Sequence, residues 1–242
     1  MKKAAIITAV VAVVGVICAV LVLRGWPGVL IGSGNLETEE YAFANFTRVE
    51  ISSAFEFEIR QSSSYGINVT ADDNVIDYVQ VSQDGQTLKI RVGGVPSFRR
   101  VTLKASVTMP QLGGLTVSGA SRGTVSDFSC TDAVSIAVSG ASRVTGDITA
   151  GDIEFDVSGA STVQLEGSAD DMVAIISGAS CFSLGDFTVN NANVNVSGAS
   201  TGTINLDGRL DANVSGASTL LYIGDPIMGA INVSGASTLK KK

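Results

Sequence analysis

The chain has 242 residues, of which 23 are acidic and 16 are basic, giving a formal net charge of −7. This acidity argues against a nucleic-acid partner, because nucleic acids bind to basic surfaces. The chain contains no histidine, which excludes histidine-based catalytic triads, histidine general bases and the commonest zinc ligand.

Residues 1–24 predict an N-terminal transmembrane anchor. Two lysines precede an apolar run of twenty residues, 4–23, in which Thr8 is the only clearly polar side chain. As a helix this run would span about 30 Å, the thickness of the hydrocarbon core of a bilayer. A cleaved signal peptide is the alternative, but the residues after the run do not resemble a small-x-small cleavage site. The two lysines against the single Arg24 predict a single-pass cell-membrane protein with a cytoplasmic N-terminus and an extracytoplasmic head.

Residues 25–40 are rich in glycine and glutamate and predict a flexible linker to a head formed by residues 41–242.

From Phe46 onwards apolar and polar residues alternate, which indicates short, half-buried strands. Ile51-Ser52-Ser53-Ala54 resembles a degenerate copy of the repeat that follows, and Asp73 to Tyr78 suit one helical turn. The larger side chains of this region predict wider coils that cap the start of a solenoid.

Residues 115–239 contain seven copies of Ser-Gly-Ala-Ser, each preceded by valine or isoleucine. From one first serine to the next, the steps are 21, 19, 19, 20, 18 and 19 residues. A period of about 20 residues is typical of a solenoid, in which each unit is stable only when stacked on its neighbours. The first serines are Ser118, Ser139, Ser158, Ser177, Ser197, Ser215 and Ser234.

Each repeat predicts two inward-facing strands and two corners. Positions one, three and five before the first serine are mostly apolar, as is the position seven after it. In the Ser-Gly-Ala-Ser corner the glycine permits the bend, and we expect the alanine to point inward. Strands that always run the same way predict a parallel β-helix, right-handed by the usual crossover preference. A leucine-rich repeat would need a longer leucine ladder, and a propeller blade about twice the period.

The three cysteines are Cys18, Cys130 and Cys181. The first lies in the apolar run, and the other two occupy different phases of the repeat more than two units apart. We therefore expect Cys130 and Cys181 to be buried small apolar residues, with a disulfide or a metal pair as the alternative.

A family resemblance is carried by Phe46-Thr47-Arg48-Val49, Ala71-Asp72-Asp73-Asn74-Val75-Ile76, the strand Leu88-Lys89-Ile90 and the Ser-Gly-Ala-Ser repeats. With these features the chain resembles the autotransporter-adhesin head domain family, the GIN domains, over about residues 34–239. The resemblance implies an all-β, right-handed parallel β-helix related in shape to pectin lyases. It also implies a role in cell adhesion and no recognised catalytic residues.

Two features are candidate sites. One is a surface ladder of hydroxyl groups from both serines of the corner, although corner serines more often bond to the turn backbone. The other is the pair Val173 and Ile175, which occupy outward positions of a strand that is apolar on both faces, so a loop or another protomer is expected to cover them. The serines of the first three copies are Ser118, Ser121, Ser139, Ser142, Ser158 and Ser161.

The sequence predicts no catalytic, cofactor-binding or metal-binding residues. Acidic corners such as Asp170-Asp171 lack the dense Gly/Asp repeat of calcium β-rolls, so turn formation explains them better. A polysaccharide lyase needs acids clustered with basic groups. Glu154 and Asp156 are adjacent outward acids, but basic residues are scarce in the repeats, where Arg122 and Arg143 share one column.

The expected function is that of a membrane-anchored, extracytoplasmic and non-enzymatic surface or adhesion module. Its partner would be a glycan or a surface protein, bound through many weak contacts, and the chain is a candidate homo-oligomer. A polysaccharide-active enzyme of pectin-lyase-like shape and a structural spacer or envelope-sensing component are the alternatives. Lys240, Lys241 and Lys242 follow the last repeat, where their charge is expected to discourage strand pairing.

Overall fold

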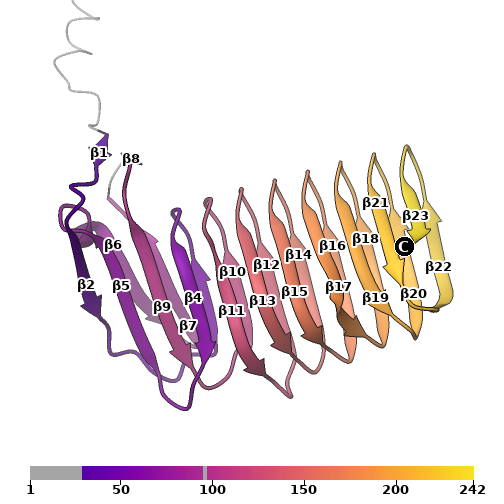
Figure 1. The fold of residues 1–242 in the computed structure, drawn as a ribbon, viewed down its shortest axis with the longest axis horizontal. Coiled ribbons are helices and arrows are strands. Elements are labelled where there is room, and N and C mark those ends of the chain that lie inside the picture. The colour runs from indigo at the N-terminus through magenta and orange to yellow at the C-terminus, as the bar shows by residue number, and fades with distance from the viewer. Residues whose placement is uncertain (1–28, 95–96) are drawn as a thin grey trace, which may run out of the picture.

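The computed structural model describes residues 29–94 and 97–242, which form an all-β solenoid built from two long sheets (Figure 1). The ten-stranded sheet has the order β22-β20-β18-β16-β14-β12-β10-β3-β7-β6, and the eleven-stranded sheet β2-β5-β9-β4-β11-β13-β15-β17-β19-β21-β23. In this part of the chain no helix is long and apolar enough to cross a membrane. The anchor predicted at residues 1–24 lies outside the described residues.

The seven repeats form seven pairs of strands, one strand in each sheet. Their strands pair in parallel with those of the neighbouring coils, so equivalent repeat positions stack in columns along the rod. The repeat strands in the ten-stranded sheet are β10 (Gly114–Val117), β12 (Val134–Val138), β14 (Ile153–Val157), β16 (Asp171–Ile176), β18 (Asn191–Val196), β20 (Arg209–Val214) and β22 (Ile227–Val233). Those of the eleven-stranded sheet are β11 (Arg122–Ser129), β13 (Arg143–Thr149), β15 (Thr162–Ser168), β17 (Cys181–Val189), β19 (Thr201–Leu206), β21 (Thr219–Ile223) and β23 (Thr238–Lys241).

The apolar columns predicted from the repeat form the core between the two sheets. The residue before each first serine is fully buried from Val117 to Val214 and becomes exposed only at Val233 in the last coil. Larger side chains are packed into the same layer, where Phe155 makes edge-to-face contact with Phe182 and Phe187. The prediction of a parallel β-solenoid is confirmed.

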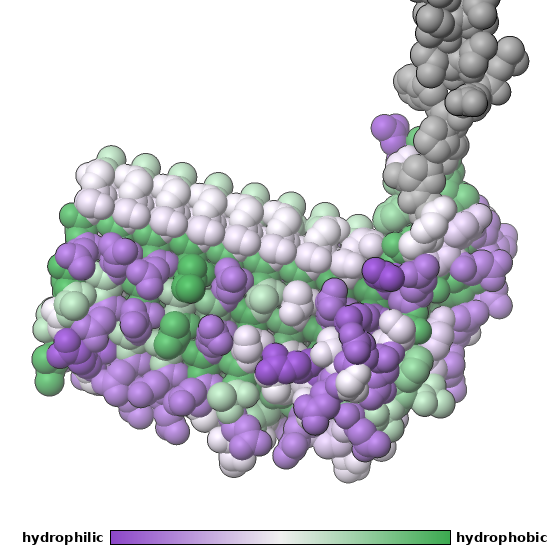
Figure 2. Space-filling model, turned by 180° about the vertical axis from the view of Figure 1, so that it is seen from behind, coloured by the Kyte–Doolittle hydropathy of each residue, from purple (hydrophilic) through white to green (hydrophobic). Residues whose placement is uncertain are grey.

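The Ser-Gly-Ala-Ser corner differs from its prediction in one respect. Its glycines do adopt positive φ angles, for example 78° at Gly140 and 77° at Gly178. A Cβ atom added at Gly178 would also lie 2.3 Å from the carbonyl oxygen of Gly159 in the preceding coil. The alanines, however, are exposed rather than turned inward, and the second serines are buried in every copy except the last. The corners therefore form a ridge of small residues along one edge of the rod (Figure 2).

The N-terminal part contains antiparallel strands that the sequence did not predict. Strand β5 (Gly66–Asp72) lies between β2 (Leu36–Glu40) and β9 (Leu103–Met109) and is antiparallel to both, and β6 (Val79–Asp84) is antiparallel to β7 (Thr87–Val92). Within the predicted linker 25–40, Leu30–Ile31 and Leu36–Glu40 form strands that pair with β8 (Phe98–Arg99) and β5. The remaining elements are β1 (Leu30–Ile31), β3 (Arg48–Ile51), β4 (Glu56–Gln61), β8 (Phe98–Arg99) and a single 3-10 turn, η1 (Ile76–Tyr78).

The two cysteines of the described region are both free thiols. Cys130 is partly buried, and Cys181 is exposed at the start of β17. The prediction that Cys181 is a buried apolar residue is wrong, because its repeat position begins a strand just after the corner, where the side chain points outward.

Candidate functional site

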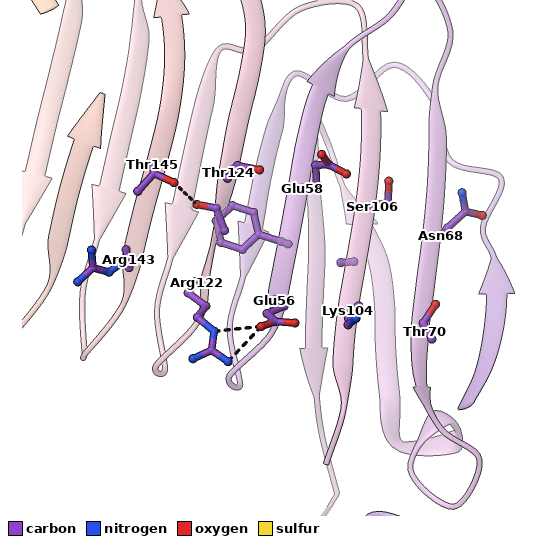
Figure 3. A pocket seen from close by; sticks show the side chains of 13 residues that line it. Glu56, Glu58, Asn68, Thr70, Lys104, Ser106, Arg122, Thr124, Arg143 and Thr145 are labelled. Carbon is purple, nitrogen blue, oxygen red and sulfur yellow. Dashed lines mark hydrogen bonds and ion pairs between the residues drawn. The ribbon is translucent and has the colours of Figure 1, made fainter. Parts of the chain in front are cut away.

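A shallow pocket of about 560 Å³ lies on the outer face of the eleven-stranded sheet. It crosses five neighbouring strands, β5, β9, β4, β11 and β13, where the regular coils meet the antiparallel N-terminal part (Figure 3). Polar side chains point outward from these strands in two rows, because alternate residues of a strand face the same side. We call this area the polar surface. It is lined by Glu56, Phe57, Glu58, Asn68, Thr70, Lys104, Ala105, Ser106, Arg122, Gly123, Thr124, Arg143 and Thr145.

The first row carries the charges. Strand register places Arg143 beside Arg122, Arg122 beside Glu56, and Glu56 beside Lys104, with Thr70 ending the row. Residues that are up to 66 positions apart in sequence thus become neighbours. Strands are about 4.8 Å apart, so an extended ligand crossing them would meet each of these groups in turn.

One ion pair lies in the middle of this row. Arg122 Nε and Nη2 donate hydrogen bonds to Glu56 Oε1 over 3.2 and 3.1 Å. Both side chains are at least half exposed, and exposed pairs of this kind typically stabilise a fold by less than about 1 kcal/mol. The pair is therefore more important for the position of the guanidinium group than for stability.

The two outer cations of the row are available to a ligand. Within the part of the chain that the structure describes, neither Arg143 nor Lys104 forms an ion pair or a side-chain hydrogen bond. Their charges flank the Arg122–Glu56 pair on either side (Figure 3). A ligand with two separated anionic groups would match this spacing without breaking an existing contact.

The second row is rich in hydroxyl and amide groups. It runs from Thr145 through Thr124, Glu58 and Ser106 to Asn68. Glu58 forms an ion pair with Arg60 at the border of the pocket. Hydroxyl and amide groups both donate and accept hydrogen bonds, so this row suits a ligand that carries many hydroxyl groups.

The floor of the polar surface depends on one glycine. Gly123 lies beside Phe57 on the neighbouring strand, and the Phe57 side chain is only 5% exposed. Because Gly123 has no side chain, the strands approach closely above this ring. The floor between the two rows therefore consists of closely packed backbone.

Of the serines in the predicted hydroxyl ladder, only the first one of each copy is at the surface. Ser118, Ser139 and Ser158 are partly exposed. The second serines are buried, with exposed fractions of 0% for Ser121 and 2% for Ser142. The prediction that Ser121, Ser142 and Ser161 belong to a surface ladder is therefore wrong.

Two groups can be distinguished among the buried serines. The Oγ atoms of Ser121, Ser142 and Ser161 have no hydrogen-bond partner among the described residues. Further along the rod, Ser180 Oγ donates to the Ser177 carbonyl oxygen over 2.8 Å, and the Ser180 backbone N–H donates to Ser200 Oγ over 3.3 Å. These hydroxyl groups bond to the corner backbone, as serines in turns commonly do.

Val173 and Ile175 point outward from β16, with exposed fractions of 44% and 47%. Figure 2 shows this face, on which hydrophobic side chains stand among polar ones. Asn193 and Asn195 follow them on β18, and Glu154 and Asp156 precede them on β14. No described segment of the chain covers the two side chains, so their role as an interface stays a prediction.

The repeat spacing alone is enough to predict that some residues of the polar surface share one column. Arg122 and Arg143 both lie four residues after a first serine, and the same count from Ser52 in the degenerate copy leads to Glu56. Lys104 and Asn68 follow no repeat motif, and only the path of β5 and β9 brings them to the row. The acidic pair Glu154 and Asp156 remains on the opposite sheet.

The family model described as "Putative auto-transporter adhesin, head GIN domain" matches residues 45–226 of the chain. A comparison with curated protein sequences gave no match. Similar solved structures include a putative adhesin from Bacteroides fragilis, with a TM-score of 0.81 and 22% identity, covering 88% of this chain and 100% of that one.

Two further structures have the same fold. A putative adhesin from Parabacteroides merdae has a TM-score of 0.69 and 17% identity, covering 88% of this chain and 98% of its own. A putative lipid binding protein from Parabacteroides distasonis has a TM-score of 0.61 and 20% identity, covering 89% of this chain and 100% of its own.

Proposed function

The chain belongs to the family described as "Putative auto-transporter adhesin, head GIN domain", and on this premise we propose that it is a non-enzymatic binding module whose ligand contacts the polar surface. The ligand we propose is an extended, hydroxyl-rich chain with anionic groups, such as an acidic glycan. The observation that carries the proposal is the pair of unengaged cations, Arg143 and Lys104, on either side of the Arg122–Glu56 pair.

The chemistry of the two rows supports this ligand class. An arginine binds carboxylate groups with charge-assisted hydrogen bonds, and its planar guanidinium group presents several donors at once. The hydroxyl and amide row beside it can bond to sugar hydroxyl groups. The chain as a whole carries a net charge of −7, but Arg143 and Lys104 are not paired with a carboxylate among the described residues, so each can attract an anionic group of the ligand.

The arrangement favours binding over catalysis. Glu56 and Glu58 are each paired with an arginine, so neither is placed as a free general base opposite a second acid. A flat surface also leaves a ligand in contact with water along its whole length. Many weak contacts, repeated over several copies, would supply the affinity.

The proposed location is the outside of the cell membrane, with residues 1–24 as an uncleaved anchor. The support for it is the apolar run at residues 4–23 and the lysines before it. Mass spectrometry of the mature protein from membranes would test this. An intact N-terminus supports the anchor, and a mature chain that starts near Gly32 would overturn it.

The binding function is tested by screening the full chain, kept soluble with a mild detergent, against an array of neutral and acidic glycans. We expect binding to acidic glycans that weakens with salt, because exposed charges are screened at high ionic strength. Binding only to acidic proteins would redirect the proposal to a protein ligand. Blank results across glycans and cell surfaces would favour a structural spacer instead.

A further inference from the structure

The two terminal strands of the eleven-stranded sheet carry opposite charges. Strand β2, with the sequence Leu-Glu-Thr-Glu-Glu, is the first strand of that sheet, and β23, which contains Lys240 and Lys241 and is followed by Lys242, is the last. They lie at opposite ends of the rod (Figure 1). Each strand bonds to one neighbour only, β2 to β5 and β23 to β21. Among the described residues, the other edge of each strand makes no backbone hydrogen bond.

The two free edges run in the same direction. Strand β2 is antiparallel to β5, and β5 is antiparallel to β9, so β2 is parallel to β9. From β9 through β4 to β23 every pairing is parallel. Consequently, β23 of one copy placed against β2 of a second copy would continue the sheet with another parallel pair, like those inside the rod.

Two facing pairs in such a contact would match in charge. Glu39 aligns with the buried Val69, and Glu40 with the outward Asn68. Lys241 follows the inward column of Tyr222, so Lys242 is on the outward side. A register that keeps inward residues together therefore places Lys241 beside Glu39 and Lys242 beside Glu40, about 4.8 Å apart.

Among the described residues, the last coil also carries an uncovered apolar layer. Met228 and Val233 continue the buried columns of Leu210 and Val214, yet they are 43% and 46% exposed. In every earlier coil, the next coil covers these positions. A second copy stacked on this end would cover them in the same way and remove apolar surface from water.

Contacts between like ends are disfavoured. Two β23 strands would bring lysines together, and two β2 strands would bring glutamates together. Like charges directly opposite each other destabilise a strand pair, and charged edges commonly prevent uncontrolled pairing. The lysines therefore disfavour pairing between two β23 strands but permit pairing between β23 and β2.

From these observations, we propose that copies of this chain associate head to tail, with β23 of one copy pairing with β2 of the next. The contact uses different surfaces on its two sides, so it generates open filaments or rings rather than closed two-fold dimers. It does not involve the polar surface and does not depend on the proposed ligand.

Sedimentation velocity of the full chain in a mild detergent tests the proposal. We expect species larger than the monomer, whose fraction rises with protein concentration and falls with salt. The charge-reversed variants are Lys242→Glu and Glu40→Lys, which face each other in this register. They avoid Lys241 and Glu39, which contact Asp225 and Tyr41. Either reversal should weaken association by about tenfold or more.

The decisive result is rescue. An equimolar mixture of the two variants, or one chain carrying both reversals, restores opposite charges across the contact and should associate again. Glu154→Lys, on the outer face of β14 in the middle of the rod, is the control and should leave association unchanged. Thermal unfolding of each variant confirms that it is folded. A chain that stays monomeric, or oligomers that neither reversal weakens, would overturn the proposal.

Discussion

Gly123 on β11 lies beside Phe57 on β4 so closely that a Cβ atom at Gly123 would sit 2.1 Å from the Phe57 carbonyl oxygen and 2.5 Å from its ring. The obstacle includes backbone, which cannot move aside as the end of a flexible side chain can. The two strands that form the centre of the polar surface thus depend on this glycine for their spacing.

We expect Gly123→Ala to lower the free energy of unfolding by about 1–3 kcal/mol, the usual range for overpacking a well-packed core. Chemical denaturation would measure the change. Gly185→Ala is the matched control, because its added Cβ would meet no atom closer than 3.6 Å. Equal losses in the two variants would contradict the assigned role of Gly123.

Replacing a buried serine with alanine is expected to have opposite effects on stability at Ser142 and at Ser180. Ser142→Ala removes a hydroxyl group that has no partner among the described residues, so stability should stay the same or rise by about 1 kcal/mol. Ser180→Ala removes a hydrogen bond to the Ser177 carbonyl oxygen and should cost about 1 kcal/mol. Chemical denaturation of both variants checks the pair, and a larger loss at Ser142 would show that its hydroxyl group is bonded.

Two adjacent isoleucines of β16 provide a second contrast. Ile176 is fully buried, and Ile175 is 47% exposed. Ile176→Ala should cost about 2–5 kcal/mol through the cavity that it leaves, whereas Ile175→Ala should stay within about 0.5 kcal/mol. A large loss of unfolding free energy at Ile175 in dilute protein would mean that another segment covers it.

Tyr41 predicts a loss of stability at alkaline pH. Burial, together with its hydrogen bond to the Glu39 carboxylate, raises the pKa of Tyr41 to about 12. The folded state therefore favours the neutral phenol. The resulting stabilisation is complete below the ordinary pKa of about 10 and is lost as the pH rises through about 12. In thermal unfolding across this range, Tyr41→Phe should reduce the decline, and an unchanged decline would exclude Tyr41 as its cause.

The polar surface predicts which substitutions affect the ligand. Arg143→Gln or Lys104→Gln should weaken binding to an acidic glycan by about tenfold, since each removes a charge-assisted contact. Arg91→Gln, on the other sheet, is the control and should bind as the unmodified chain does. Titration at two salt concentrations would show whether the two variants also lose salt dependence. Undiminished binding in both would place the ligand elsewhere.

The repeat pattern was enough to predict which residues form the core, but not which residue of the corner faces inward. Its inward columns follow from the alternation before and after each first serine, because a buried valine or isoleucine recurs at the same phase in nearly every coil. The corner holds two small residues, and the pattern alone does not show whether Ala120 or Ser121 faces inward. Burial of a hydroxyl group runs against its usual preference for water, so the reverse was expected.

The N-terminal strands limited the prediction of the candidate site. Arg122 and Arg143 share a repeat column and could be placed together from the sequence. Lys104 lies on β9, which reaches the row only after the chain has formed the antiparallel strands β5 and β6. Such insertions depend on long-range pairing rather than on a local period, which is why the sequence did not reveal the complete surface.

The in-register columns have a consequence for how the length of this protein can change. Each coil contacts only the coils before and after it, so a whole repeat is the smallest segment that can be lost or gained without misaligning a column. Removing one would shorten the rod by a single step of about 4.8 Å and leave every remaining corner glycine stacked on another. Evolution can therefore adjust the reach of this molecule in discrete increments, while the surface near its N-terminal end is left unaltered.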